Sequence, residues 1–152
     1  MSKFVIYCDG GCRGNHKSEN IGGWGASLQY NEHKHEIYGG VENTTNNKME
    51  LTACIKALEV IKDNRYKEIP VEIYCDSAYV VNGMNSWITG WVARGWKKAD
   101  KKPVENQDLW KRLLALSLCF DDIKFIKVKG HADNEGNIRA DELVNQAMDE
   151  IN

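Results

Sequence analysis

Phe4-Val5-Ile6-Tyr7-Cys8-Asp9 carries the strongest structural signal in the chain. A short apolar run ends here at a carboxylate, and Gly10 and Gly11 follow directly. β-Favouring residues closed by glycines predict a buried strand that leaves a sheet. Asp9 is then expected at the carboxyl end of that strand, the edge at which α/β sheets build ligand sites. Ile73-Tyr74-Cys75-Asp76 repeats the pattern. If the two strands are parallel neighbours, their aspartates converge and require a proton or a cation between them.

Apolar patterns along the rest of the chain predict further strands and helices. Strands are expected over residues 22–30, 36–41, 71–76 and 123–128, with 31–35 as a hairpin connection. Helices are expected after the capping stretch Thr44-Thr45-Asn46-Asn47, after Asp76-Ser77, over 106–118, and from about Ala140 to Ile151. This order predicts an α/β fold.

Two of the predicted helices carry an acid near their start, beside the apolar face. Glu50 has apolar or small residues at +4, +7 and +11, and Asp141 has apolar residues at +3 and +7. The helix dipole favours an acid near an N-terminus. It does not explain an acid turned toward the core, so both residues are candidates for a site.

Composition limits the class of protein. The 152 residues suit one domain spanning 1–152, and 42% hydrophobic and 28% charged residues are ordinary globular values. With a formal net charge of only -2, any binding of nucleic acid must use a local patch. Met1-Ser2-Lys3 leads straight into the first strand, without a leader pattern or a long apolar span, so we expect a cytoplasmic protein that does not associate with membranes. We also expect a monomer. The number of cysteines is odd, five, which indicates free thiols in a reducing compartment. Only Cys8 and Cys12 are close enough in sequence to suggest a zinc site, and we do not expect one.

The stretch over about 85–104, which we call the handle, is rich in tryptophan and lysine. Trp87, Trp91 and Trp96 are four and five residues apart, and five basic residues against the single acid Asp100 lie between Trp87 and Pro103. Such a pattern fits phosphate pairing and base stacking on a nucleic acid, although tryptophans at this spacing can equally belong to the core.

Four carboxylates lie at the ends of predicted elements: two end strands, and two lie near the start of helices. They are Asp9, Glu50, Asp76 and Asp141. Each alone has a plain structural explanation, such as a helix cap. Together they predict an all-oxygen site for hard divalent cations such as Mg²⁺. Two such ions roughly 4 Å apart would clamp the attacking and leaving oxygens of a phosphodiester.

At this point the sequence resembles the type 1 ribonucleases H, in particular the bacterial members, over nearly its whole length. The blocks that carry the resemblance are Asp9–Asn15, Thr44–Leu51, Asp76–Val80, Arg94–Val104, and Val128–Ala132 with Asp141. Several blocks in the right order are more specific than one short motif.

The resemblance implies an RNase H-like fold, a five-stranded mixed sheet whose first three strands are antiparallel, with helices on both faces. It implies an endoribonuclease that hydrolyses the RNA strand of RNA/DNA hybrids and leaves 5′-phosphate and 3′-hydroxyl ends. Asp9, Glu50, Asp76 and Asp141 match the family's catalytic, metal-binding acids, which hold two Mg²⁺ ions, with Mn²⁺ as a substitute. His131 matches a mobile-loop histidine, for which proton shuttling or product release is expected.

The resemblance also implies contacts with the hybrid. Cys12 and Asn46 match positions that touch the RNA strand near its 2′-hydroxyls. Asn15, Thr45, Asn47 and Trp87 match positions that hold the DNA strand and a phosphate. The handle adds Trp91, Arg94, Trp96, Lys97 and Lys98 as predicted substrate contacts.

The chain also departs from the bacterial pattern. Ala78 replaces a common glutamine near the RNA strand, and Val92 and Ala93 replace lysines of the handle. We therefore expect weaker binding and a shallower salt dependence, since each lost phosphate contact lowers the slope by about 0.7 to 0.9.

Two rival classes stay open at the level of sequence. A non-catalytic hybrid-binding module would keep the handle but would need no set of four acids. A related phosphoryl-transfer enzyme, such as a transposase or a junction nuclease, would share the acids but is not expected to carry the handle together with the Gly130-His131 loop.

Overall fold

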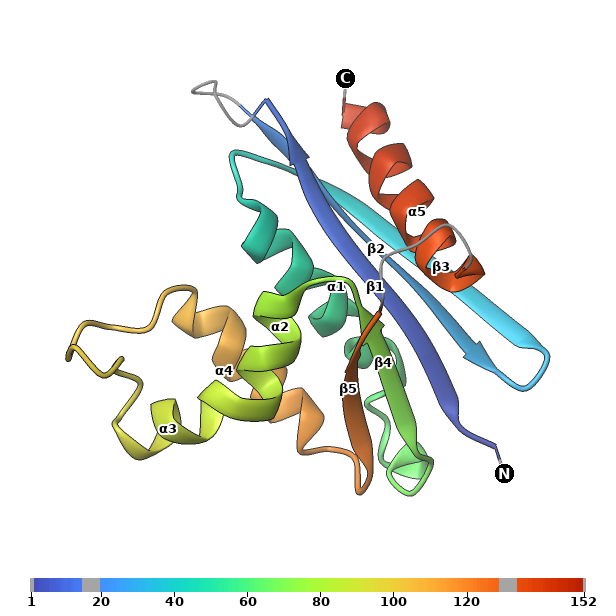
Figure 1. Cartoon of the computed structure of the whole chain (residues 1–152). Coiled ribbons are helices and arrows are strands. Elements are labelled where there is room, and N and C mark those ends of the chain that lie inside the picture. The colour runs from blue at the N-terminus through green and yellow to red at the C-terminus, as the bar shows by residue number, and fades with distance from the viewer. Residues whose placement is uncertain (1, 15–19, 129–133, 152) are drawn as a thin grey trace.

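The computed structural model describes residues 2–14, 20–128 and 134–151, and its centre is a five-stranded sheet (Figure 1). The strands are β1 Phe4–Arg13, β2 Ile21–Tyr30, β3 His33–Glu42, β4 Val71–Cys75 and β5 Ile123–Lys127, in the order β3-β2-β1-β4-β5. β1, β2 and β3 are antiparallel to their neighbours, whereas β4 pairs parallel with both β1 and β5. The mixed RNase H-like sheet expected from the resemblance is confirmed.

Helices cover both faces of this sheet. The elements are α1 Asn46–Ile61, η1 Asn64–Tyr66, α2 Ala78–Asn82, the π-helical η2 Gly83–Trp87, α3 Ile88–Ala93, α4 Gln107–Ser117 and α5 Glu135–Ile151. α5 packs on β1, β2 and β3, while α1 packs on β1 and β2 and also against α4. Figure 1 shows α5 on one side of the sheet and α1, α2, α3 and α4 on the other. Within the described residues, no helix is both long and apolar enough to span a membrane.

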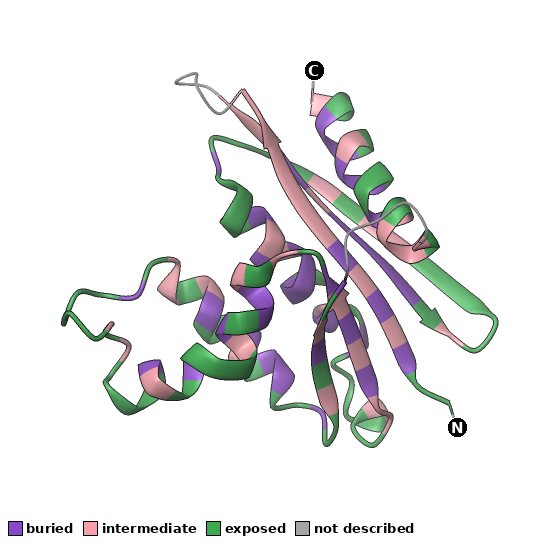
Figure 2. Cartoon of the chain, viewed as in Figure 1, coloured by how far each residue is buried: buried purple, intermediate pink, exposed green. Residues whose placement is uncertain are grey.

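The main core fills the space between the sheet and the helices on the α1 side. Ile6 and Ile73 of the central strands are fully buried, as are Leu51 and Leu58 of α1 and Trp110 of α4. Buried and partly exposed residues alternate along β4 and over residues 4–9 of β1 (Figure 2). This alternation is the period of two expected for strands with one face on a core.

β1 is longer than the sequence pattern predicts. The expected strand ends at Asp9, but residues 10–13 continue it and pair with residues 21–24 of β2. The glycines at this point do not form a turn, because Gly11 lies opposite Gly23 in a regular antiparallel ladder. What ends near Asp9 is the parallel pairing of β1 with β4, whose last pair is Cys8 and Cys75.

The hairpin between β2 and β3 is also tighter than expected. Only Asn31 and Glu32 form the turn, and residues 33–35, expected in the connection, belong to β3. Asn31 takes the left-handed conformation at φ 55°, which asparagine adopts more readily than most residues and which two-residue hairpins require.

Two helix details differ as well. Leu118, the last residue of the helix expected over 106–118, lies beyond the end of α4 at Ser117 and is 74% exposed. α5 begins at Glu135 rather than near Ala140, since the Asn134 side chain caps it by accepting a hydrogen bond from the Asn137 N–H at 3.0 Å.

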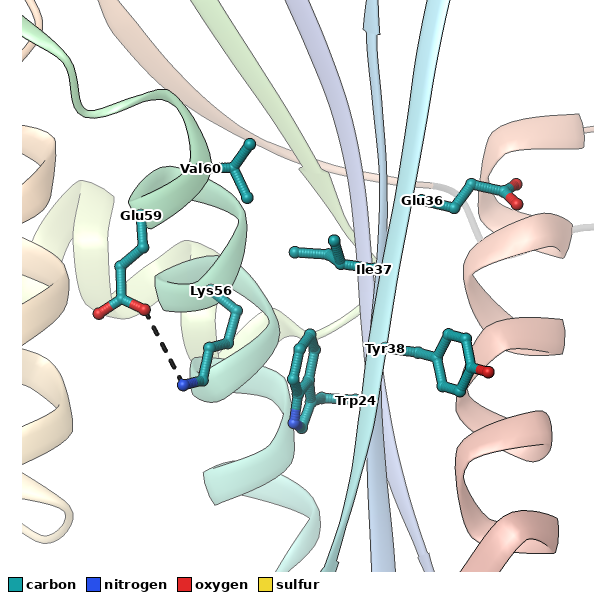
Figure 3. Close-up of a pocket in the computed structure, with 7 residues that line it drawn as sticks. All are labelled: Trp24, Glu36, Ile37, Tyr38, Lys56, Glu59 and Val60. Atoms are coloured by element: carbon teal, nitrogen blue, oxygen red, sulfur yellow. Dashed lines mark ion pairs between the residues drawn. The ribbon is translucent and has the colours of Figure 1, made fainter.

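Side chains of β3 alternate between the two helical layers. Figure 3 shows Ile37 on the α1 side of the strand and Glu36 and Tyr38 on the α5 side. Arg139 of α5 donates to both Glu36 oxygens at 2.6 and 2.9 Å, and the Tyr38 hydroxyl donates to Glu150 at 2.9 Å. A groove of about 500 Å³ beside this strand is lined by Trp24, Glu36, Ile37, Tyr38, Lys56, Glu59 and Val60. None of these residues is a predicted site residue.

Candidate active site

Asp9 and Asp76 are neighbours because β1 and β4 run parallel and in register. Cys8 and Cys75 form the last pair of the ladder, and each aspartate is the next residue of its segment. Asp76 directly follows β4 and is exposed, whereas Asp9 lies inside β1 and is partly buried. The repeated sequence motif therefore does bring two acids together.

Glu50 approaches the same point from the start of α1. The N–H of Gly10 donates to Oδ1 of Asp9 at 2.9 Å and also to Oε1 of Glu50. A Cβ on Gly10 would overlap the Met49 carbonyl carbon and lie 2.5 Å from the Glu50 nitrogen. The glycine after Asp9 is thus the feature that lets α1 bring Glu50 against β1.

The pKa values of the two inner carboxyl groups are raised. Burial is the main cause for Glu50, and the charge of Asp9, a hydrogen bond with Asp9 and the charge of Asp76 raise its pKa further. Burial is also the main cause for Asp9, where bonds with Glu50 and Gly10 lower the pKa and the charges of Asp141 and Asp76 raise it. Both shifts favour the protonated form, so the metal-free site favours binding of a proton or a cation.

Asp141 belongs to α5, on the face of the sheet opposite α1. Its side chain is exposed, and Nδ2 of Asn145 donates to its backbone oxygen at 3.0 Å and to its Oδ2 at 3.5 Å. Asn145 is itself held by Arg13 of β1, which donates to Asn145 Oδ1 at 2.9 Å. Because α5 begins early, Asp141 lies in the second turn of the helix rather than the first.

In the described part of the chain, the four acids do not lie close enough together to form one set of metal ligands. Within residues 2–14, 20–128 and 134–151, no three His, Cys, Asp or Glu side chains form a group that could hold a metal ion. Asp9 and Glu50 form an inner pair, and Asp76 and Asp141 are exposed around it and act on Asp9 through their charges. Repulsion between carboxylates opposes a closer approach of the four acids.

The residues predicted to touch the RNA and DNA near α1 lie together. Cys12 of β1 pairs with Gly22 of β2, and a Cβ on Gly22 would overlap the Thr44 side chain just before α1. Thr45 caps α1 by accepting the Lys48 N–H at 3.1 Å, and its exposed hydroxyl can still donate. The two further predicted contacts, Asn46 and Asn47, are exposed at the first positions of α1.

The handle separates into a packed and an exposed part. Trp91 is only 8% exposed, and its ring centroid lies 5.9 Å from that of Trp87, 6.3 Å from Trp96 and 5.1 Å from Trp110. Trp91 is therefore mainly a packing residue of the handle, with little surface available for the predicted contact with substrate. Trp87, in contrast, is 41% exposed.

The basic residues of the handle face solvent. Arg94 and Lys97 are exposed, and Nε of Arg94 donates to the Lys97 carbonyl at 3.1 Å. Lys98 is partly exposed, and its backbone is fixed by hydrogen bonding to Lys102 at 2.8 Å. Trp96 is partly buried and lies 5.5 Å from the Lys111 ammonium.

Two predicted site residues, Asn15 and His131, lie outside the described residues. Sequence reasoning did not single out Arg13, Asn145 or Lys127. Lys127 of β5 lies 3.6 Å from Asp76 Oδ1. Only its position, one residue before the Val128–Ala132 block, points to it in the sequence.

The fold and the acidic edge define an RNase H-like α/β protein, and comparison with known proteins gives the same result. A family model described as RNase H matches residues 1–149. The chain is 50% identical to a ribonuclease H of Ruthia magnifica, covering 99% of both chains, and 49% identical to a ribonuclease HI of Caulobacter vibrioides, covering 99% of this chain and 95% of the relative.

Solved structures agree. LC9-RNase H1, described as a type 1 RNase H with the type 2 active-site motif, superposes with a TM-score of 0.86 at 28% identity, covering 99% of this chain and 74% of that one. LC11-RNase H1, solved in complex with an RNA/DNA hybrid, superposes with a TM-score of 0.74 at 28% identity, covering 98% and 99%. This chain belongs to the ribonuclease H family. Its activity is cleavage of the RNA in RNA/DNA hybrids, and the family generally uses a divalent metal.

Proposed function

We propose that Asp9, Glu50, Asp76 and Asp141 hold two Mg²⁺ ions and that the chain cuts the RNA strand internally, leaving 5′-phosphate and 3′-hydroxyl ends. The observation that carries the proposal is the inner pair of Asp9 and Glu50 on the Gly10 N–H, with Asp76 beside it where the β1–β4 ladder ends. A donor set made only of carboxylates fits a hard divalent cation, and Mn²⁺ is the natural substitute.

We also propose a role for each of the four acids. We assign Asp9 to both ions, Glu50 and Asp76 to one ion, and Asp141 to the other. When bound, the ions supply Lewis-acid stabilisation of the phosphodiester and activation of water. Gly10 holds the inner carboxylates in place through its N–H, and Asn145 orients Asp141.

Two surfaces are proposed to hold the hybrid. Cys12 and Asn46 would face the RNA strand, and Thr45, Asn47, Asn15 and Trp87 would face the DNA strand. In the handle, Trp87 offers an exposed ring, and Arg94, Trp96, Lys97 and Lys98 supply positive charge and a further aromatic surface. His131 would serve proton transfer or product release. Reading one strand by its 2′-hydroxyls while holding the other as DNA would select the hybrid over either pure duplex.

The test is cleavage of a strand-labelled RNA/DNA hybrid in Mg²⁺, beside RNA/RNA and DNA/DNA duplexes of the same sequence. The proposal predicts internal cuts in the hybrid RNA alone, with products that a 5′-phosphate-dependent exonuclease degrades. Products with 2′,3′-cyclic phosphate ends, or cutting of either control duplex at a comparable rate, would contradict it.

A further inference from the structure

Lys127 is placed to act on one of the four proposed metal ligands. It is the last residue of β5 and pairs with Cys75, the residue before Asp76. Its Nζ lies 3.6 Å from Asp76 Oδ1 and donates to the Val128 carbonyl oxygen at 3.0 Å. The backbone contact anchors the ammonium beside the carboxylate.

This ion pair sets Asp76 apart from the other three acids. In the part of the chain that the structure describes, the ion pairs involve neither Asp9, Glu50 nor Asp141. Asp76 therefore has a protein cation of its own. A divalent ion that approaches Asp76 would compete with the Lys127 ammonium for Oδ1.

We propose that Lys127 is a tethered counter-ion of the metal-free site, a positioning residue that neutralises Asp76 until Mg²⁺ displaces it. The proposal rests on the assignment of Asp76 as a metal ligand under the proposed function. Lys127 then stabilises the folded protein in the absence of metal and weakens the binding of the first ion.

The expected effect is small, because the Lys127 and Asp76 side chains are 45% and 48% exposed. Exposed ion pairs are screened by water and contribute little. We expect removal of the Lys127 charge to tighten Mg²⁺ binding by about two- to fivefold at low ionic strength, and the effect to disappear in high salt.

The experiment is a calorimetric titration of the metal-free full chain with MgCl₂, without substrate. The variants are Lys127→Met, Lys127→Arg and a matched control, Lys124→Met, which removes one charge from the same strand. Lys124 is three residues before Lys127, so its side chain points to the opposite face of β5, and its charge lowers the pKa of Glu72. Lys127→Met is expected to bind Mg²⁺ more tightly than Lys124→Met and to melt at a lower temperature without metal, whereas Lys127→Arg is expected to behave as the unmodified chain.

An Asp76→Asn background separates this inference from the proposed function. If Asp76→Asn leaves Mg²⁺ binding unchanged, the proposed metal site itself is wrong. If Asp76→Asn weakens binding but Lys127→Met equals Lys124→Met or binds more weakly, only the role of Lys127 is overturned. If Lys127→Met tightens binding in the natural background and has no effect in the Asp76→Asn background, the pair acts as proposed.

Discussion

Asp9 and Glu50 share a single backbone N–H, that of Gly10, although they come from a strand and a helix 41 positions apart in the chain. The sharing is possible because α1 runs so close to β1 that no side chain fits at position 10. Local backbone packing therefore fixes the geometry of the inner acids before any cation binds.

Replacing Gly10 tests this relationship. Gly10→Ala should destabilise the protein by about 1–3 kcal/mol and reduce hybrid cleavage, because the added methyl group overlaps the α1 backbone. The matched control is Gly11→Ala, whose Cβ would meet only the Val144 side chain, at 3.7 Å. Urea unfolding and cleavage rates should separate the two variants. Equal stability of both would contradict the account.

The raised pKa of Glu50 predicts how stability depends on pH in the metal-free protein. The folded state holds the Glu50 proton more tightly than the unfolded chain, so stability should fall as pH rises from the ordinary glutamate pKa through the raised one. Glu50→Gln should remove much of this slope and be more stable than the unmodified chain at pH 8, by on the order of 1–3 kcal/mol. Unfolding in urea with EDTA at several pH values measures this. A metal-free chain that gains stability with rising pH over this window would contradict it.

Magnesium should offset this loss of stability. At pH 8, added Mg²⁺ should raise the melting temperature of the unmodified chain, because an ion that binds only the folded state stabilises it. The same addition should have a smaller effect on Asp9→Asn. Equal shifts in the two proteins would mean that the ion binds elsewhere.

Two of the three tryptophans of the handle, Trp91 and Trp87, should differ in their effects on stability and on binding. Trp91→Ala should cost about 3–5 kcal/mol of stability, because Trp91 is buried among aromatic rings. Trp87→Ala should change stability much less but weaken hybrid binding by about 1–3 kcal/mol, if the exposed ring stacks on the nucleic acid. Chemical unfolding and a binding titration with an uncleaved hybrid measure the two effects. A binding defect without loss of stability in Trp91→Ala would reverse these roles.

The Tyr79 hydroxyl links α2 to the start of α4 and offers a further test. It accepts hydrogen bonds from Nε1 of the fully buried Trp110 at 3.0 Å and from Nδ2 of Asn106 at 3.1 Å. Tyr79→Phe should cost about 1–3 kcal/mol, because the buried indole N–H then has no acceptor at this position. Thermal unfolding measures the loss, and an unchanged melting temperature would contradict the prediction.

The sequence predicted the order of the elements and the convergence of Asp9 and Asp76, because apolar runs and a repeated motif are local signals. It did not predict that β1 continues past Asp9, since glycines usually end strands, whereas here Gly10 allows α1 to approach the strand. Side-chain spacing alone could not separate Trp91 from Trp87, because burial depends on Trp110 from a distant helix. Lys127 was missed for the same reason, since its partner Asp76 follows another strand, β4.

The four carboxylates are proposed to bind the ions that the cleavage of hybrid RNA requires. The most direct measurement is the cleavage rate of a labelled hybrid in Mg²⁺ by Asp9→Asn, with Glu142→Gln as the control for loss of an acid beside Asp141. The account predicts that Asp9→Asn remains folded and loses cleavage, whereas Glu142→Gln cuts at nearly the normal rate. Normal cleavage by a folded Asp9→Asn protein would contradict it.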